Sequence, residues 1–234
     1  MRAKLTILKL GGSVITNKKK PFTPNKKAIT RLAKEIKQAN VEFLLLIHGG
    51  GSFGHPIAKK YEIRNGYKDS SQIMGFSKTH QAMVSLNKII LDALNQKEIP
   101  AVAVQPSAFI TTDNGRITCM DKEIVLKLLE FGITPVLYGD VVLDSDLGFT
   151  ILSGDQLVSS LAIKLNADRI IMGLDVDGLF TKDPKIHSSA RLLHPAQTLD
   201  VHLRGKRAVH QVPLPDFRSG EHSRGLPDWE GAHE

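Results

Sequence analysis

The stretch from Phe43 to His55 constrains the fold more than any other part of this chain. The apolar run FLLLIH is followed at once by GGGSFGH. The run has the length and composition of a buried strand in a parallel sheet. Glycines at its end let backbone N–H groups approach a ligand, and a helix expected over 55–60 would turn its N-terminus toward an anion. The stretch predicts either a phosphate-binding loop or a tight turn that needs glycine for its geometry alone.

Composition narrows the class of protein. The net charge of +7 favours anionic partners, but the lysines are spread along the chain, and neither an RNA-binding aromatic motif nor zinc-finger spacing is present. No apolar run approaches transmembrane length, and the segment after Lys4 is too short for a signal peptide. The single cysteine, Cys119, fits a reducing compartment. We expect a cytoplasmic protein that binds neither nucleic acid nor a membrane.

Apolar runs alternate with segments of helical periodicity along most of the chain. Strands are expected over 6–10, 43–47, 101–104, 134–138 and 169–173, and helices after Thr23 and over 55–60, 70–95, 123–130 and 156–165. The turn signals at 113–115 and 144–148 predict two hairpins. Strands that alternate with helices imply an α/β fold, which we expect to be a three-layer αβα sandwich with a mostly parallel central sheet.

Three glycine-containing turns, 11–13, 49–52 and 139–140, directly follow predicted strands. Because ligands of open α/β sheets bind outside the carboxyl ends of the strands, these turns are expected to converge. Lys9 lies within an apolar strand, so it either faces an anion or extends its ammonium group to solvent from the strand end. The Walker, protein-kinase and dinucleotide patterns are absent. Backbone donors with a lysine and a histidine suit phosphoryl transfer.

Five motifs together resemble those of the amino acid kinase superfamily. They are Lys9-Leu10-Gly11-Gly12-Ser13, His48-Gly49-Gly50-Gly51, Gly139-Asp140, Ser153-Gly154-Asp155 and Asp175-Val176-Asp177-Gly178-Leu179-Phe180. Within that superfamily, Gly49–His55, Thr181–Pro184 and the pair Lys9 and Lys18 resemble the isopentenyl phosphate kinases. The resemblance covers residues 5 to about 206, and it is specific only as a set of motifs.

The resemblance implies that ATP, with Mg²⁺, phosphorylates isopentenyl phosphate to isopentenyl diphosphate. It assigns catalytic roles to Lys9, Lys18, His55 and Asp155. Lys18 would reach the transferring group, His55 would bind the acceptor phosphate in its protonated form, and Asp155 would orient the lysines or the metal. No general base is needed, because the acceptor oxygen is already ionised at neutral pH.

The same resemblance assigns the binding residues, without naming a metal ligand. The expected nucleotide-binding residues are Lys9, Gly11, Gly12, Ser13, Gly51, Asp175, Asp177, Gly178, Phe180 and Lys206. The expected acceptor-binding residues are Gly50, Gly54, His55, Gly139 and Asp140. Ile73, Phe76, His80 and Met83, on the predicted helix over 70–95, are expected to form the wall for the isoprenoid tail, although such a stripe also suits ordinary helix core.

The end of the chain departs from the family pattern. Residues 200–206 lack the glycine pair that family members carry before Arg-Gly-Lys, and apolar residues are sparse from Val201 onward. We therefore expect an acceptor lobe over 1–150, an ATP lobe over 151–200, and an atypical tail over 201–234 that is disordered or the product of a reading-frame change. Family members are commonly dimers, so a homodimer is expected. Two other functions stay open: a kinase for another phosphate or phosphonate such as fosfomycin, and a catalytically impaired nucleotide-binding protein.

Overall fold

The computed structural model describes residues 4–176, 178–182, 186–195 and 209–211. Within them a central sheet has the strand order β12-β9-β1-β2-β6-β3. All of its pairings are parallel except that of β12 with β9. The strands are β1 (Leu5–Leu10), β2 (Phe43–His48), β3 (Ala101–Ala103), β6 (Thr134–Tyr138), β9 (Arg169–Gly173) and β12 (Val209–Gln211). The mostly parallel sheet expected from the sequence is confirmed.

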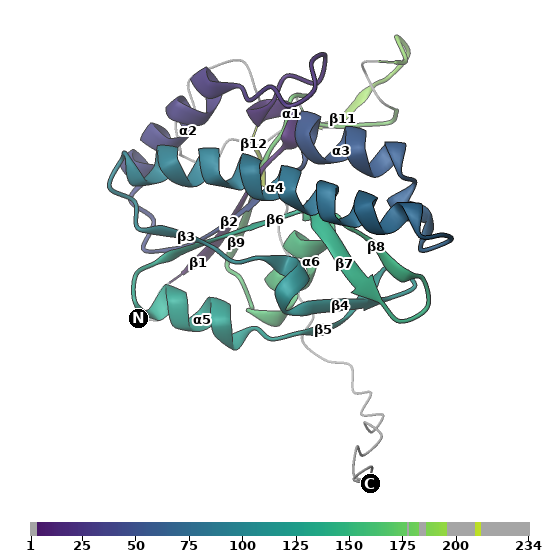
Figure 1. Cartoon of the computed structure of the whole chain (residues 1–234). Helices are drawn as coiled ribbons and strands as arrows, with labels where there is room; N and C mark the ends of the chain where they lie inside the picture. Colours follow the sequence, from purple (N-terminus) through teal and green to yellow (C-terminus); the bar gives the residue numbers. More distant parts are fainter. Residues whose placement is uncertain (1–3, 177, 183–185, 196–208, 212–234) are drawn as a thin grey trace, which may run out of the picture.

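Helices cover both faces of this sheet (Figure 1). On one face lie α1 (Gly12–Ile15), α2 (Lys26–Ala39), α3 (Gly51–Lys60) and α4 (Ser71–Asn95), and on the other lie α5 (Glu123–Glu130) and α6 (Gly154–Lys164). Strand β2 shows why. Leu44 and Leu46 pack against the first group of helices, whereas Leu45 and Ile47 pack against the second. The αβα layering is therefore confirmed for the described residues.

A second sheet, of order β5-β4-β7-β8, flanks the first. It contains both predicted hairpins, formed by β4 (Ile110–Asp113) with β5 (Arg116–Met120) and by β7 (Asp140–Asp144) with β8 (Gly148–Leu152). The Asp144 carboxylate accepts backbone N–H bonds from both turns, at Gly115 (2.8 Å) and at Leu147 (2.8 Å). Burial alone would raise its pKa, but these bonds and the Thr112 hydroxyl lower the pKa to about 2.

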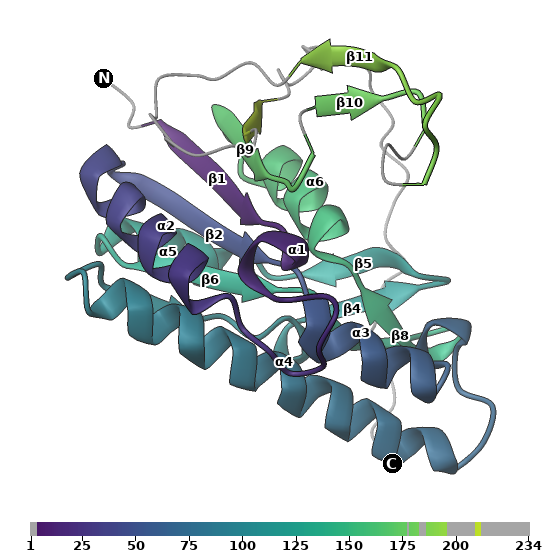
Figure 2. The ribbon, with the colours of Figure 1, turned by 90° about the horizontal axis from the view of Figure 1, so that it is seen from above.

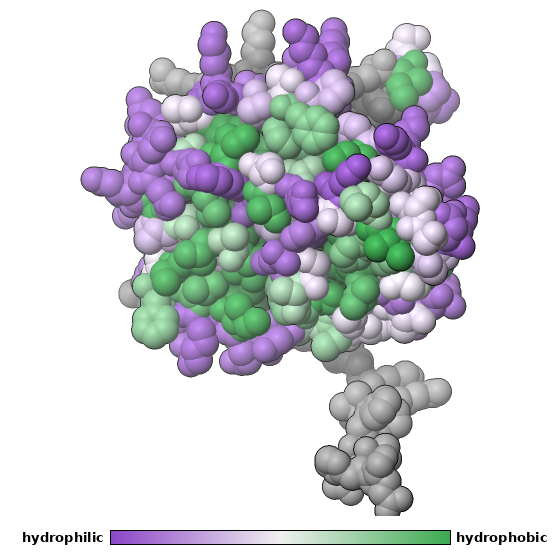
Figure 3. Space-filling view, viewed as in Figure 1, coloured by the Kyte–Doolittle hydropathy of each residue, from purple (hydrophilic) through white to green (hydrophobic). Residues whose placement is uncertain are grey.

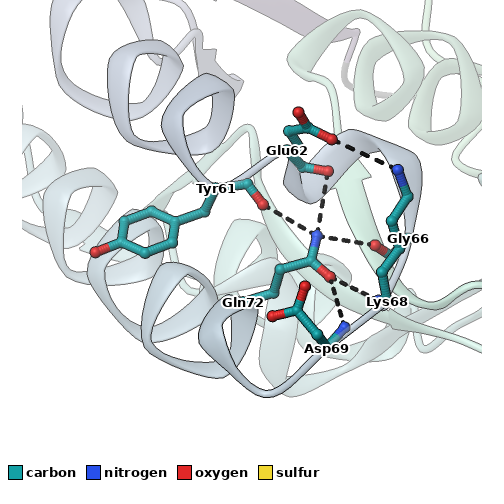
Figure 4. A network of polar contacts seen from close by, with 6 residues as sticks. All are labelled: Tyr61, Glu62, Gly66, Lys68, Asp69 and Gln72. Atoms are coloured by element: carbon teal, nitrogen blue, oxygen red, sulfur yellow. Dashed lines mark hydrogen bonds and ion pairs between the residues drawn. The ribbon is translucent and has the colours of Figure 1, made fainter.

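The connection from α3 to α4 contains a short 3₁₀ turn, Ile63–Asn65, and is closed by one buried amide (Figure 4). The Gln72 Nε2 donates to the carbonyls of Tyr61 (3.0 Å) and Gly66 (3.1 Å), and its Oε1 accepts from the Lys68 N–H (2.6 Å). A buried amide with all these partners fixes the loop it closes. The two helices are thus held at a set spacing on this side of the molecule.

The structure corrects three sequence-based expectations about helices. Helix α3 begins at Gly51 rather than His55, so His55 lies inside the helix. Helix α2 is capped by the Asn25 side chain, which accepts from the Ala28 N–H, rather than by Thr23. On α4 the predicted stripe is only partly buried: Ile73 is 58% exposed, whereas Met83 is 2% exposed.

Beyond β9 the described chain forms a small antiparallel sheet of β10 (Gly178–Phe180) and β11 (Leu192–Pro195). Figure 2 shows this hairpin apart from the central sheet. Most of the predicted tail lies outside the described residues, and its one described part, β12, extends the central sheet. No helix among the described residues combines the length and the apolar character that crossing a membrane requires.

Candidate active site

The three predicted glycine turns meet at one edge of the central sheet. In Figure 2, β1 and β2 end against α1 and α3. Backbone bonds join the turns to one another: the Gly49 N–H donates to the Leu10 carbonyl (3.0 Å), and the Gly139 N–H donates to the His48 carbonyl (3.0 Å). The Gly11 N–H donates to the Gly173 carbonyl at 2.9 Å, which brings the end of β9 to the same edge. The sequence-based expectation of convergence is confirmed.

The first two turns touch backbone to backbone. A Cβ atom added at Gly12 would lie 2.4 Å from the Gly51 nitrogen, and one at Gly49 would lie 2.9 Å from the Gly12 nitrogen. Gly51 also has a positive φ of 48°. Glycine is therefore required at 12 and 51 by the close approach of two main chains, and at 51 by its conformation as well.

A cavity of about 160 Å³ opens between these turns, α3, α4 and the second sheet. Its lining is partly polar and partly apolar. Its polar wall consists of Lys9, Gly12, Gly49, Gly50, Gly54, His55, Thr79, Gly139, Asp140, Ser153, Gly154 and Asp155, and its apolar wall of Ala58, Met83, Ile151 and Leu152. Such a cavity suits a small ligand with an anionic head and an apolar tail.

Lys9 forms an ion pair with Asp155 in the polar wall of the cavity. Lys9 is 7% exposed, and it reaches the cavity from the interior of β1. Asp155 lies in the first turn of α6, where Ser153 caps the helix by accepting from the Gln156 N–H. The Asp155 side chain is 67% exposed, so one partner of this pair faces a ligand-accessible space.

His55 and Lys18 lie close enough to interact electrostatically. Burial, and to a smaller extent the Lys18 charge, hold the pKa of His55 below its usual value. Without an anion nearby His55 is therefore less protonated than a free histidine at neutral pH. Lys18 itself lines a second, open depression of about 500 Å³ with Ser13 and Asp175.

Asp140 is held by His80. The His80 Nδ1 lies 2.9 Å from the Asp140 Oδ2, and the Asp140 side chain is fully buried. The hydrogen bond that His80 donates to the Asp140 carboxylate raises the pKa of His80 against the opposing effect of burial. Asp140 lines the cavity, whereas His80 supports it from behind.

The predicted tail wall is only partly brought together. Met83 lines the cavity, but Ile73 is exposed, and the ring of Phe76 packs against Phe149 with centroids 5.3 Å apart. Thr79 and Ala58 line the cavity in their place. Ala58 lies three residues after His55, a helical spacing that could have indicated it. Among the nucleotide-side predictions, Asp177 and Lys206 lie outside the described residues, while Gly178 and Phe180 belong to β10.

His48 is a buried histidine that the sequence analysis left without a role. It is 1% exposed, and its ring stacks on Tyr138. Its Nδ1 lies 3.2 Å from the Gly49 carbonyl and its Nε2 3.2 Å from the Asn87 Oδ1. Burial outweighs these bonds and lowers its pKa to about 4. The neutral ring carries one N–H, which it donates either to the Gly49 carbonyl at the second glycine turn or to the Asn87 Oδ1.

The described residues do not form a complete metal site by themselves. They contain no group of three or more His, Cys, Asp or Glu side chains that could hold an ion. Magnesium in nucleotide-binding sites is commonly held by one or two carboxylates together with phosphate oxygens. The exposed carboxylate of Asp155 fits that smaller requirement.

Both the sequence and the structure of this chain match known proteins. Residues 4–206 match the model of the amino acid kinase family. A protein of Methanothermobacter thermautotrophicus, named isopentenyl phosphate kinase, is 44% identical over 204 residues, which are 84% of this chain and 76% of that protein. A protein of the same name from Methanocaldococcus jannaschii is 41% identical over 192 residues, 78% of this chain and 73% of that one.

Solved structures agree. An isopentenyl phosphate kinase crystal structure at 44% identity superposes with a TM-score of 0.77, covering 81% of this chain and 79% of the other. A substrate complex of an isopentenyl phosphate kinase, at 33% identity, has a TM-score of 0.73 and covers 81% and 78%. A Synechocystis aspartate kinase, at 20% identity, covers 80% of this chain and 31% of its own with a TM-score of 0.58, and it shares the fold.

Proposed function

The chain belongs to the amino acid kinase family and, within it, to the isopentenyl phosphate kinases, and from this premise we propose that it transfers the terminal phosphoryl group of ATP to isopentenyl phosphate. The observation that carries the proposal is the cavity that joins His55 and Lys9 to an apolar wall. A branched five-carbon tail needs that wall, and its phosphate needs the cationic and backbone donors in the polar wall.

On the donor side, we assign the ATP phosphates to the turn after β1. Lys9, Gly11, Gly12 and Ser13 lie there, and Lys18 stands on the loop that follows. Gly51 closes against Gly12, and Asp175 shares the depression with Ser13 and Lys18. We keep the division into an acceptor lobe over 1–150 and an ATP lobe over 151–200 as part of this proposal. The two lobes share one sheet, because β1 of the first pairs with β9 of the second.

On the acceptor side, we assign the monophosphate to the first turns of α3. Backbone N–H groups at a helix N-terminus favour an anion, and Gly50 and Gly54 line the cavity there beside His55. A bound phosphate would stabilise protonated His55 against the burial that now lowers its pKa. Met83, Ala58 and Ile151 then face the hydrocarbon tail.

The reaction breaks the bond between the terminal phosphorus of ATP and its bridging oxygen, and it forms a bond from an oxygen of the acceptor phosphate to that phosphorus. ADP leaves with the bridging oxygen, and no proton has to be removed from the acceptor. Lys9, Lys18 and His55 offset the negative charge where the two phosphates meet. Magnesium, when bound with ATP, would neutralise further phosphate charge, and Asp155 is the residue here that fits it.

We also propose a homodimer and a cytoplasmic location, where ATP is available. Apolar side chains gather over α5 and β3 on the face shown in Figure 3. Val102 is 37% exposed, Ile124 42% and Phe131 80%. Strand β3 is also an edge of the central sheet, so this side suits a second copy of the chain. Sedimentation of the wild type against Phe131→Glu, which would shift the protein toward monomer, tests the dimer.

The kinase activity is tested by ADP release from ATP, magnesium and isopentenyl phosphate, with His55→Ala beside the wild type. Removing a charge-assisted hydrogen bond to the acceptor should lower kcat/KM for isopentenyl phosphate about 100-fold. Lys59→Ala, an exposed change on the same helix, is the matched control and should retain wild-type turnover. Turnover that His55→Ala retains would contradict the assignment.

The same assay separates the remaining alternatives. Faster turnover of fosfomycin than of isopentenyl phosphate would indicate that the acceptor is a phosphonate. Binding of ATP without turnover of any acceptor would indicate an impaired nucleotide-binding protein.

A further inference from the structure

Thr16 connects the two phosphate turns by hydrogen bonds. It follows α1, it is 3% exposed, and its hydroxyl donates to the Gly12 carbonyl at 2.6 Å. The same oxygen accepts the Ser52 N–H at 2.9 Å. Ser52 lies in the first turn of α3, where the N-cap residue, Gly50, contributes no side-chain bond. A side chain 36 positions earlier in the chain thus satisfies one of the first-turn donors of α3.

Ser52 extends the connection to the loop that carries Lys18. Its carbonyl accepts the Phe22 N–H at 3.0 Å. Its hydroxyl lies 3.2 Å from the Thr23 nitrogen, which donates to it, and 3.3 Å from the Thr23 carbonyl. Ser52 is 3% exposed and its bond to Thr16 is buried, whereas its partner Phe22 is 52% exposed. The Gly12 turn, the start of α3 and the far end of the lysine loop therefore share one small network centred on Ser52.

We propose that Thr16 and Ser52, here called the Thr16–Ser52 clasp, are positioning residues that hold the donor and acceptor phosphate sites at a fixed separation. The inference rests on the proposed function and extends it to two residues to which neither phosphate has been assigned. In-line phosphoryl transfer requires the two reacting groups to be held in near-attack geometry, and a misplacement of about 1 Å costs about 100-fold in rate.

The chemistry of the clasp suits this role. Both side chains are uncharged, so the separation they set does not change with pH while His55 and the phosphates titrate. Close packing reinforces it, because a Cβ atom at Gly51 would lie 2.1 Å from the Thr16 Oγ1. Loss of the Thr16 hydroxyl would leave the Ser52 N–H without its partner in a buried place, whereas the Gly12 carbonyl would keep the Thr16 N–H at 3.0 Å.

The test compares Thr16→Val with Thr16→Ser. Valine keeps the shape and removes the hydroxyl, whereas serine keeps the hydroxyl. We expect kcat to fall between 10-fold and 100-fold in Thr16→Val while KM for ATP and for isopentenyl phosphate each change less than threefold, because each site still binds its own ligand. Thr16→Ser should stay within threefold of the wild type. Ser52→Ala, which keeps the backbone bond to Thr16, should lose less kcat than Thr16→Val.

Two further measurements separate this proposal from simple destabilisation and from a wrong substrate. Val125→Ala, buried in α5 on the opposite face, should lower the Tm without changing kcat. Equal kcat in the two Thr16 variants would overturn the positioning role. Hydrogen exchange of the Ser52 amide needs no acceptor: exchange at least tenfold faster in Thr16→Val than in Thr16→Ser supports the clasp, and equal rates overturn it. A wild type inactive toward isopentenyl phosphate would refute the proposed function alone.

Discussion

The turns after β1 and β2 differ from the turn after β6 in what holds them in place. The main chains of the first two lie so close together that a Cβ atom added at Gly12 or Gly49 would lie under 3 Å from the other turn, and the uncharged Thr16–Ser52 clasp also joins them. The third, Gly139–Asp140, leads into a strand and is supported by the charged pair of Asp140 with His80. One side of the site is therefore fixed by sterics, and the other by a titratable contact.

The largest expected effect is at the ion pair that links the two sides. Lys9 comes from β1 and Asp155 from α6, next to the Gly139 turn. Lys9→Met should lower kcat by about 100-fold to 1,000-fold, the usual loss when one stabilising donor is removed from a reaction centre. Its free energy of unfolding should change by only about 1 kcal/mol, since an apolar residue of similar length replaces a buried charge. Steady-state kinetics measure kcat, and urea unfolding measures the free energy of unfolding. A Lys9→Met variant that does not fold would contradict a mainly catalytic role for Lys9.

The side formed by the first two turns is tested by Gly12→Ala. The new Cβ would lie 2.4 Å from a backbone nitrogen that cannot rotate away, so the two turns must separate. We expect kcat to fall about 100-fold and stability to fall by about 2 kcal/mol.

Gly139→Ala is the matched variant on the other side. Its Cβ would lie 3.2 Å from the Gly154 nitrogen, a contact that a shift of a few tenths of an ångström relieves. It should stay within about threefold of wild-type kcat. Similar losses of kcat in Gly12→Ala and Gly139→Ala would contradict the difference between the first two turns and the third.

His55 should take up a proton when the acceptor phosphate binds. Its pKa is lowered in the free protein, and a phosphate dianion raises it, so binding takes up a proton between these two pKa values and weakens as the pH rises across that interval. The KM for isopentenyl phosphate, divided by that of His55→Gln, should therefore increase by up to about tenfold per pH unit between the pKa of the free protein and that of the complex, and stay constant above it. The ratio cancels titration of the acceptor itself. A ratio that does not change with pH would contradict protonation of His55.

The smallest expected effect is on stability, at His80. Because Asp140 raises its pKa, the pair contributes fully below the unfolded pKa of about 6.5 and is lost as the pH rises through the higher folded value. Asp140 and the Gln105 amide are the groups that raise it. The wild type should exceed His80→Gln by about 1 kcal/mol at pH 6 and by little at high pH. Chemical unfolding at both pH values measures this difference in free energy of unfolding. A difference that is the same at both pH values would contradict a titrating pair of His80 with Asp140.

The sequence predicted most elements because local signals agreed with the fold. Strands β6 and β9 and helix α5 have the predicted bounds, and both hairpin turns occur where Asn114 and Gly148 take positive φ. Helix α3 was predicted to start too late because glycines normally weaken a helix. Here the tertiary contacts of Ser52 and the burial of Phe53 stabilise its first turn.

The site was less predictable, because its side-chain pairs join distant segments. Lys9 and Asp155 are separated by 146 positions, and His80 and Asp140 by 60. On α4, periodicity indicated the buried face correctly from Met83 onward but not near the start of the helix. Gln72 and Thr79 are buried because each donates a hydrogen bond to a backbone carbonyl there, whereas Ile73 is exposed. Only the three-dimensional neighbours of a helix decide such choices.

The pairing of β1 with β9 has a consequence for biosynthesis. Leu5 and Asp168 exchange backbone and side-chain bonds across 163 positions, and the Gly11 N–H is held by the carbonyl of Gly173. A chain emerging from the ribosome can assemble β1, β2, β6 and the acceptor cavity walls before β9 has been made. The first strand is then an unpaired edge of the sheet, and such an edge is a site at which another chain can pair. The turn assigned to ATP is the last of the three to be completed.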